Sequence, residues 1–272
     1  MNSQSLSGIQ STLPPLTLLV PTDSDMIAAD DYGDWPAITH DNTAQSIKDY
    51  YSFAELDTTD PIDHIDVDLD NTCGDVSIIT IYIKIYKYFH RTTEFPPYSM
   101  FQSWFFQPGA MRPHLPEFFQ FLQRLKTMKK IQSVRIHTSL KQRCYIQWMV
   151  KCLEQYCNTP DLIDQIIDGT TAESSACGAT IKRLEPNTII FDDKPWNAQP
   201  SSRAIGVSMY MYTTDSSQFY RYFDKKDQPS IKKILANDAY SWNGRDVNLQ
   251  AALLDNDLIV CIDGLSQLFD LA

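Results

Sequence analysis

The chain has 272 residues, of which 43% are hydrophobic and 12% aromatic, so it is long and apolar enough to bury a core. Acidic residues outnumber basic ones by 34 to 23, for a formal net charge of -11. No Lys/Arg run is long enough to follow extended nucleic acid, and no stretch approaches the roughly 20 apolar residues of a membrane span. The N-terminus also lacks a signal-like apolar segment. We therefore expect a cytoplasmic or nuclear protein that binds neither extended nucleic acid nor membranes.

Residues 1–60 are rich in Ser, Thr, Asp and Pro, which predicts a loosely structured N-terminal extension. An apolar patch, Leu16 to Val20, and one short helix near Ala44 to Phe53 interrupt the polar pattern. The extension is interpreted as a solvated tail, with an arm that covers a site or binds a partner as the alternative. Residues 61–272 are expected to form one catalytic domain, and all of its motifs lie within residues 62–200.

Short apolar segments alternate with helical patterns along this domain. Strand, helix and strand in that order indicate an α/β fold with a parallel sheet and crossover helices. The strands are predicted at His64 to Asp68, Val134 to Ile136, Thr188 to Phe191 and Ile205 to Tyr212, with weaker segments at Asp161 to Ile167 and Ala179 to Leu184. The helices are predicted after Pro113 around Phe118 to Leu125, at Gln142 to Tyr156, and within Ser230 to Leu271.

The segment from Val76 to Phe89 has a different pattern. Isoleucines at every second position from Ile79 to Ile85 alternate with Thr, Tyr and Lys. A period of two with β-branched residues is typical of a strand with one buried face. The segment is therefore predicted to form a strand or a β-hairpin flap.

Carboxylates and a hydroxyl follow several of the predicted strands. These residues are Asp68, Asp70, Thr138, Asp192 and Asp193. Because ligands of open α/β sheets collect outside the carboxyl ends of the strands, the residues that end them can meet in space. Carboxylates so close together repel one another unless a cation lies among them, and oxygen ligands suit magnesium. The sequence therefore predicts a Mg²⁺ site.

The residues of this set can divide a phosphoryl-transfer reaction among them. In the Asp68-Leu69-Asp70-Asn71-Thr72 segment the first carboxylate can attack phosphorus, while Asp70 exchanges a proton with the leaving oxygen. Thr138 offers a hydroxyl to a phosphoryl oxygen, and Lys182 can offset the charge of the nucleophile and of the transferring group.

The DLDNT, IHTS, Lys182 and IIFDD elements, in this order, resemble the four motifs of the haloacid dehalogenase superfamily. RPHLPEFFQFL and IIFDDKPWN are most similar to the branch of C-terminal-domain phosphatases and NLI-interacting-factor-like proteins. The resemblance covers about Ile62 to Pro200. It implies a Rossmann-like three-layer sandwich with a central parallel sheet. Because the segments between the first three motifs are short, we expect no large cap domain, a feature that in this superfamily usually accompanies an open site and macromolecular substrates.

The same resemblance implies roles for single residues. Asp68 would carry an aspartyl-phosphate, Asp70 would act as acid and base with its carbonyl on Mg²⁺, and Thr138 and Lys182 would hold the phosphate. The acidic pair, Asp192 and Asp193, would complete the metal site, with Asp193 as the direct ligand.

Some assignments stay open at this point. Lys194 and Lys141 are alternatives to Lys182, and Asp192 is the alternative to Asp193 as the direct metal ligand. Three residues depart from the family pattern, namely Cys73 after the threonine, Asp66 in the first strand and His137 before Thr138.

The function expected from these features is Mg²⁺-dependent hydrolysis of phosphomonoesters, with a phosphorylated protein or a small phosphomonoester as substrate. One alternative is a binding or scaffold protein that keeps the fold with little or no turnover. The other is a phosphatase that acts on nucleotides or nucleic-acid ends.

Overall fold

The computed structural model describes residues 51–169, 173–174, 180–211, 225–237 and 254–271. Most of the expected N-terminal extension therefore lies outside the described residues, as does most of the short helix near Ala44 to Phe53. Within 51–60, the 3-10 turn η2 (Phe53–Glu55) contacts the core, because the Phe53 ring lies 6.1 Å from that of Phe191.

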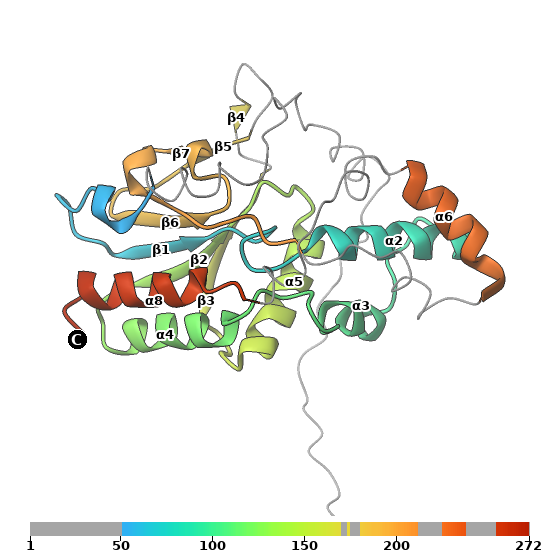
Figure 1. The fold of residues 1–272 in the computed structure, drawn as a ribbon, viewed down its shortest axis with the longest axis horizontal. Helices are drawn as coiled ribbons and strands as arrows, with labels where there is room; N and C mark the ends of the chain where they lie inside the picture. The colour runs from blue at the N-terminus through green and yellow to red at the C-terminus, as the bar shows by residue number, and fades with distance from the viewer. Residues whose placement is uncertain (1–50, 170–172, 175–179, 212–224, 238–253, 272) are drawn as a thin grey trace, which may run out of the picture.

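Five parallel strands form the central sheet in the order β3-β2-β1-β6-β8 (Figure 1). In the middle, His64 of β1 pairs with Ser133 on one side and Thr188 on the other. The carboxyl ends of these strands share one edge, and the predicted α/β fold with a central parallel sheet is confirmed. The strands are β1 (His64–Val67), β2 (Ser133–His137), β3 (Ile163–Ile167), β6 (Thr188–Asp192) and β8 (Ala204–Gly206).

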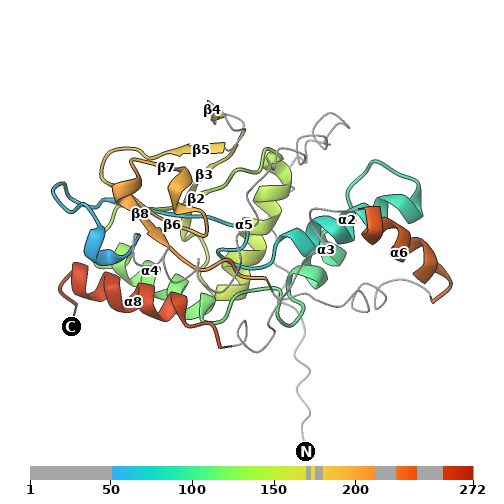
Figure 2. The ribbon, with the colours of Figure 1, turned by 45° about the horizontal axis from the view of Figure 1, so that its top comes forward.

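Helices α4 (Leu115–Thr127) and α8 (Asp257–Leu268) lie side by side against one face of this sheet (Figures 1 and 2). A proline in its first turn suits the start of α4, where backbone N–H groups have no helical partner. The Phe118 ring of α4 meets that of Phe191 on β6 at 5.3 Å. Helix α5 (Arg143–Cys157) packs against α4 and β3 and connects β2 to β3.

A small second sheet covers the opposite face and gives the fold its third layer (Figure 1). Its strands are β4 (Glu173–Ser174), β5 (Thr180–Arg183) and β7 (Ala198–Gln199). β4 and β5 are antiparallel. This antiparallel pair follows the second motif, and β5 itself carries Lys182.

The strand or flap predicted for Val76 to Phe89 is wrong, because this segment is helix α2 (Ser77–His90). Both parities of the isoleucine-rich run are buried, so the period of two did not mark one face. The helical signal is a less buried polar stripe at Thr80, Lys84 and Lys87, which are spaced i, i+4 and i+7. Burial among neighbouring helices outweighed the β-propensity of isoleucine.

Helix α2 packs against α3 (Tyr98–Phe105) and α6 (Gln228–Asn237), beyond the carboxyl ends of the central strands (Figures 1 and 2). Tyr82 of α2 stacks on Trp104 of α3 with ring centroids 5.0 Å apart. Of the strand expected from Ile205 to Tyr212, the described residues 205–211 form strand only in β8, and Tyr212 lies outside the described residues. Helix α8 is the helix expected within Ser230 to Leu271. None of the described helices has the length and apolar character needed to span a membrane.

Candidate active site

The loop that follows β1 fixes the first candidate carboxylate. Asp68 continues the sheet ladder, since its backbone N–H donates to the carbonyl of Phe191 over 2.9 Å. The chain then turns through Asn71, whose φ of 60° is tolerated by asparagine, and Asn71 N donates to Gly74 O over 2.8 Å. Leu69 is fully buried beneath the turn. These bonds fix the backbone at Asp68. The residue is buried, with 5% of its surface exposed.

Lys182 reaches this carboxylate from β5, in the small second sheet. Its Nζ lies 2.5 Å from Asp68 Oδ1 and 2.7 Å from Asp192 Oδ2. All three residues are buried. One ammonium group thus joins the end of β1 to the end of β6.

Thr72 makes a second connection between the same two motifs. Its hydroxyl donates to Asp68 Oδ2 over 3.1 Å, and the backbone N–H of Asp193 donates to that hydroxyl oxygen over 3.0 Å. The backbone N–H of Lys194 donates to Asp192 Oδ1 over 2.7 Å. The DxDxT loop and the acidic pair are therefore linked through side chains as well as through the sheet.

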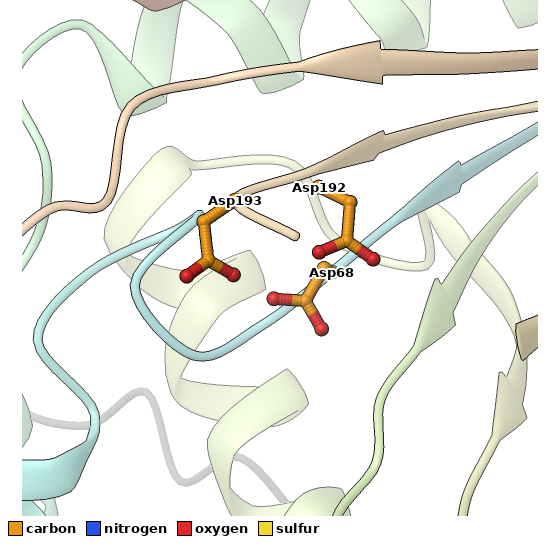
Figure 3. Close-up of side chains that lie close together, drawn as sticks. All are labelled: Asp68, Asp192 and Asp193. Atoms are coloured by element: carbon orange, nitrogen blue, oxygen red, sulfur yellow. The ribbon is translucent and has the colours of Figure 1, made fainter. Parts of the chain in front are cut away.

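Three carboxylates meet at this edge of the sheet, as Figure 3 shows. One oxygen from each of Asp68, Asp192 and Asp193 lies within 4.8 Å of the others. Asp193 Oδ2 is buried, and among the described residues it has no hydrogen-bond partner.

The electrostatics of the site reflect this crowding. Burial raises the pKa of Asp193 well above its usual range. The charge of Lys194 opposes this increase, whereas the negative charges of Asp68, Asp192 and Asp70 add to it. Burial also raises the pKa of Asp68, although the charge of Lys182 opposes the increase. For Lys182, burial disfavours the ammonium, but attraction by Asp192 and Asp68 is stronger and raises its pKa. The protein alone does not balance the charge it gathers here.

The donor set fits a hard divalent cation. When all groups are ionised, the four carboxylates of Asp68, Asp70, Asp192 and Asp193 outnumber the ammonium groups of Lys182 and Lys194 by two charges. Oxygen ligands in a buried acidic cluster suit Mg²⁺, and the unpartnered Asp193 Oδ2 is an available ligand atom.

The structure places the other predicted residues at the same edge. Thr138 follows the last residue of β2, is buried, and accepts a hydrogen bond from Leu140 N over 3.2 Å, which leaves its hydroxyl hydrogen to donate. Asp70 lies in the loop after β1, close enough for its charge to raise the pKa of Asp193 and Tyr145.

Of the three lysines considered, Lys182 is the one whose Nζ bridges Asp68 and Asp192. Lys141 is exposed, and Lys194 is half-buried and contacts Asp192 through its backbone.

Arg112 is a buried support of the site that the motif analysis did not single out as functional. Its Nη1 donates to Thr72 O over 3.0 Å, its Nη2 lies 3.2 Å from Asp255 Oδ2, and it also donates to Ser208 O. Arg112 thereby ties the DxDxT loop to the segment before α8. In the sequence, Arg112 is only a charged residue shortly before the start of α4, and this position does not distinguish a buried arginine from an exposed one.

Comparison with known proteins finds similarity among solved structures. No family model matches the sequence, and no curated protein matches it. Among solved structures, the chain is similar to Fcp1, described as an essential RNA polymerase II CTD phosphatase, with 16% identity and a TM-score of 0.40. The match covers 78% of this chain and 63% of that chain, so this chain spans less than two thirds of the Fcp1 structure.

Proposed function

We propose that the protein is a Mg²⁺-dependent phosphomonoester hydrolase in which Asp68 is the nucleophile. The observation that carries this proposal is the arrangement around Asp68. This buried carboxylate is bound by Lys182 and Thr72, and two further carboxylates lie next to it where parallel strands end. A fixed nucleophile beside a cation site is what phosphoryl transfer requires.

In the first step, an oxygen of Asp68 attacks phosphorus and the bond between phosphorus and the ester oxygen breaks. The leaving oxygen takes a proton from Asp70, so that an alcohol departs and an aspartyl-phosphate remains. In the second step, water attacks the same phosphorus while the Asp70 carboxylate accepts its proton. The bond between phosphorus and Asp68 breaks, which releases inorganic phosphate and restores both carboxyl groups.

The remaining residues would hold the phosphoryl group during both steps. The Thr138 hydroxyl donates to one phosphoryl oxygen, and the Lys182 ammonium stabilises the charge that develops on the others. Asp68, Asp192 and Asp193 would bind Mg²⁺, together with the backbone carbonyl of Asp70. The bound cation would neutralise the excess negative charge of the carboxylates and of the phosphate.

For the substrate, we propose a phosphorylated protein. Support comes from the helical segments beyond the strand ends, residues 77–106 and 225–237, which contain seven Lys and Arg residues but only two acidic ones. This basic character contrasts with the overall charge of -11. On α2 the stripe begins at Thr80, which hydrogen-bonds Tyr145 at 3.2 Å, and continues through Lys84 and Lys87 to Arg91. A protein substrate with acidic residues next to its phosphorylated side chain could bind this basic stripe.

The proposal is tested with an Asp68→Asn variant on an aryl phosphate and on a phosphopeptide. We expect at least a 10³-fold loss of kcat, on the order of that for removing a nucleophile, with the melting temperature retained or raised. Asp263→Asn, which changes an exposed carboxylate on α8, is the matched control and should retain full activity. Beryllofluoride with Mg²⁺ should bind the unmodified protein but not Asp68→Asn.

Two results would contradict the proposal. Turnover of Asp68→Asn equal to that of the unmodified protein removes Asp68 from the mechanism. An unmodified protein that is folded, binds Mg²⁺ and hydrolyses none of the phosphomonoesters favours a binding or scaffold role. Nucleotide monophosphates in the same panel separate phosphoprotein hydrolysis from the nucleotide alternative.

A further inference from the structure

Two residues that depart from the family pattern in the sequence are partners in the structure. Asp66 lies on β1, two residues before the candidate nucleophile, and His137 lies on β2, directly before Thr138. His137 Nδ1 is 3.0 Å from Asp66 Oδ2. Asp66 is 0% exposed and His137 is 5% exposed. Two unusual polar residues, each costly to bury alone, therefore satisfy one another inside the protein.

Arg135 completes a buried network with this pair. Its Nε is 2.6 Å from Asp66 Oδ1, and its Nη2 donates to Thr188 Oγ1 over 3.0 Å. Its Nη1 forms an ion pair with Glu185, in the segment between β5 and β6. One guanidinium group thus connects β1, β2 and β6, the three strands that end at the candidate site residues.

The network lies on the same face of the sheet as the candidate site. Side chains alternate along a strand, so Asp66 and Asp68 share a face of β1. Asp66 pairs in register with Arg135 on β2 and Ile190 on β6, which places Asp192 on that face as well. Lys182 reaches Asp68 and Asp192 from the small sheet that covers this face. The network therefore lies one step along the strands behind the acidic cluster.

We propose that Asp66, Arg135 and His137 are positioning residues for the phosphoryl site. They hold the ends of β1 and β2 so that Asp68 and Thr138 face the same phosphoryl group. This inference rests on the proposed hydrolase function. A buried ionic network contributes little net stability compared with apolar residues of similar volume, whereas its directional bonds specify geometry. Positioning matters because a shift of about 1 Å at a reacting group can reduce the rate on the order of 10²-fold.

The decisive experiment replaces the whole network with apolar residues. The triple variant Asp66→Val, Arg135→Met, His137→Val leaves no unpaired buried charge among these three, so we expect a melting temperature equal to or above that of the unmodified protein. We expect kcat for an aryl phosphate to fall at least about 10-fold, with KM within about 3-fold, because the loss affects the transition state more than substrate binding.

Two single variants provide the conservative rescue. The amide nitrogen of Asn can donate to Asp66 much as the ring Nδ1 does, so His137→Asn should keep kcat within about 3-fold. His137→Val, which cannot donate, should lose activity as the triple variant does. A purely structural role predicts the same kcat, per folded molecule, for both.

Arg203→Met is the matched control for removal of a buried arginine. Arg203 is 5% exposed and lies at the amino-terminal end of β8, where it pairs with Asp60 3.5 Å away. Its loss should lower the melting temperature without changing kcat.

The outcomes separate this inference from the proposed function. An active unmodified protein together with a triple variant of equal kcat overturns the positioning role alone. Folded, Mg²⁺-bound unmodified protein without phosphatase activity overturns both. A fall in kcat for the triple variant, with retained melting temperature and with rescue by His137→Asn, supports the inference.

Discussion

Asp193→Asn should stabilise the metal-free protein while removing its response to Mg²⁺. Asp193 Oδ2 is buried without a hydrogen-bond partner among the described residues, and the charges of Asp68 and Asp192 lie close by. An unsatisfied buried group costs about 1–3 kcal/mol, and more when it is charged. Asparagine keeps a polar group at this position but removes the charge, and with it the additional cost. We therefore expect the free energy of unfolding, measured in urea with a chelator, to rise by at least about 1 kcal/mol. For a protein of this size, each 1 kcal/mol corresponds to about 2–4 °C in melting temperature.

The pH dependence of this gain has a definite sign. The pKa of Asp193 is raised in the folded state by burial and by neighbouring carboxylates, which together outweigh the opposing charge of Lys194. Its contribution to stability is thus greatest below the pKa of the unfolded chain and is lost as pH rises through the folded pKa. The advantage of Asp193→Asn without metal should therefore increase from acidic pH upward.

Added Mg²⁺ should reverse the order of the two proteins. At a Mg²⁺ concentration of 100 times Kd, a ligand that binds only the folded state adds about 2.7 kcal/mol. The unmodified protein should gain this stability and Asp193→Asn should not. Asp263→Asn should behave as the unmodified protein in both conditions. The reasoning is refuted if Asp193→Asn is less stable than the unmodified protein without metal, or if both gain equally from Mg²⁺.

Two further variants test the charges around the site. Lys182→Met leaves Asp68 and Asp192 without their shared ammonium. Because breaking a buried ion pair costs about 3–5 kcal/mol, the free energy of unfolding in urea should fall by that amount, and kcat should fall strongly. The control variant Lys141→Met should change neither quantity. Arg91→Glu, at the exposed end of α2, should raise KM several-fold for an acidic phosphopeptide and leave the kinetics with an aryl phosphate unchanged. An equal effect on both substrates would show that α2 does not bind the substrate.

Local patterns were sufficient for the amphipathic helix α4 and for the short, buried strands β2 and β6. The apolar spacing of α4 and the short apolar runs of β2 and β6 predicted these elements, and the parallel order predicted that Asp68 and Asp192 would lie at one edge. The same reasoning failed for α2. That helix is buried on several sides by other helices, so its isoleucines carry no face-specific period.

The sequence by itself determined the chemistry available at the site and its order along the chain, because residue types at strand ends depend on short-range patterns. Tertiary structure decided which of these groups are partners. Lys182 was chosen over Lys194 and Lys141 because the small sheet brings β5 over the ends of β1 and β6. In the sequence, Asp66 and His137 are separate departures from the family pattern, and only the pairing of β1 with β2 brings them into contact. Such pairings join residues up to 114 positions apart, and they arise from packing of whole layers rather than from any local preference.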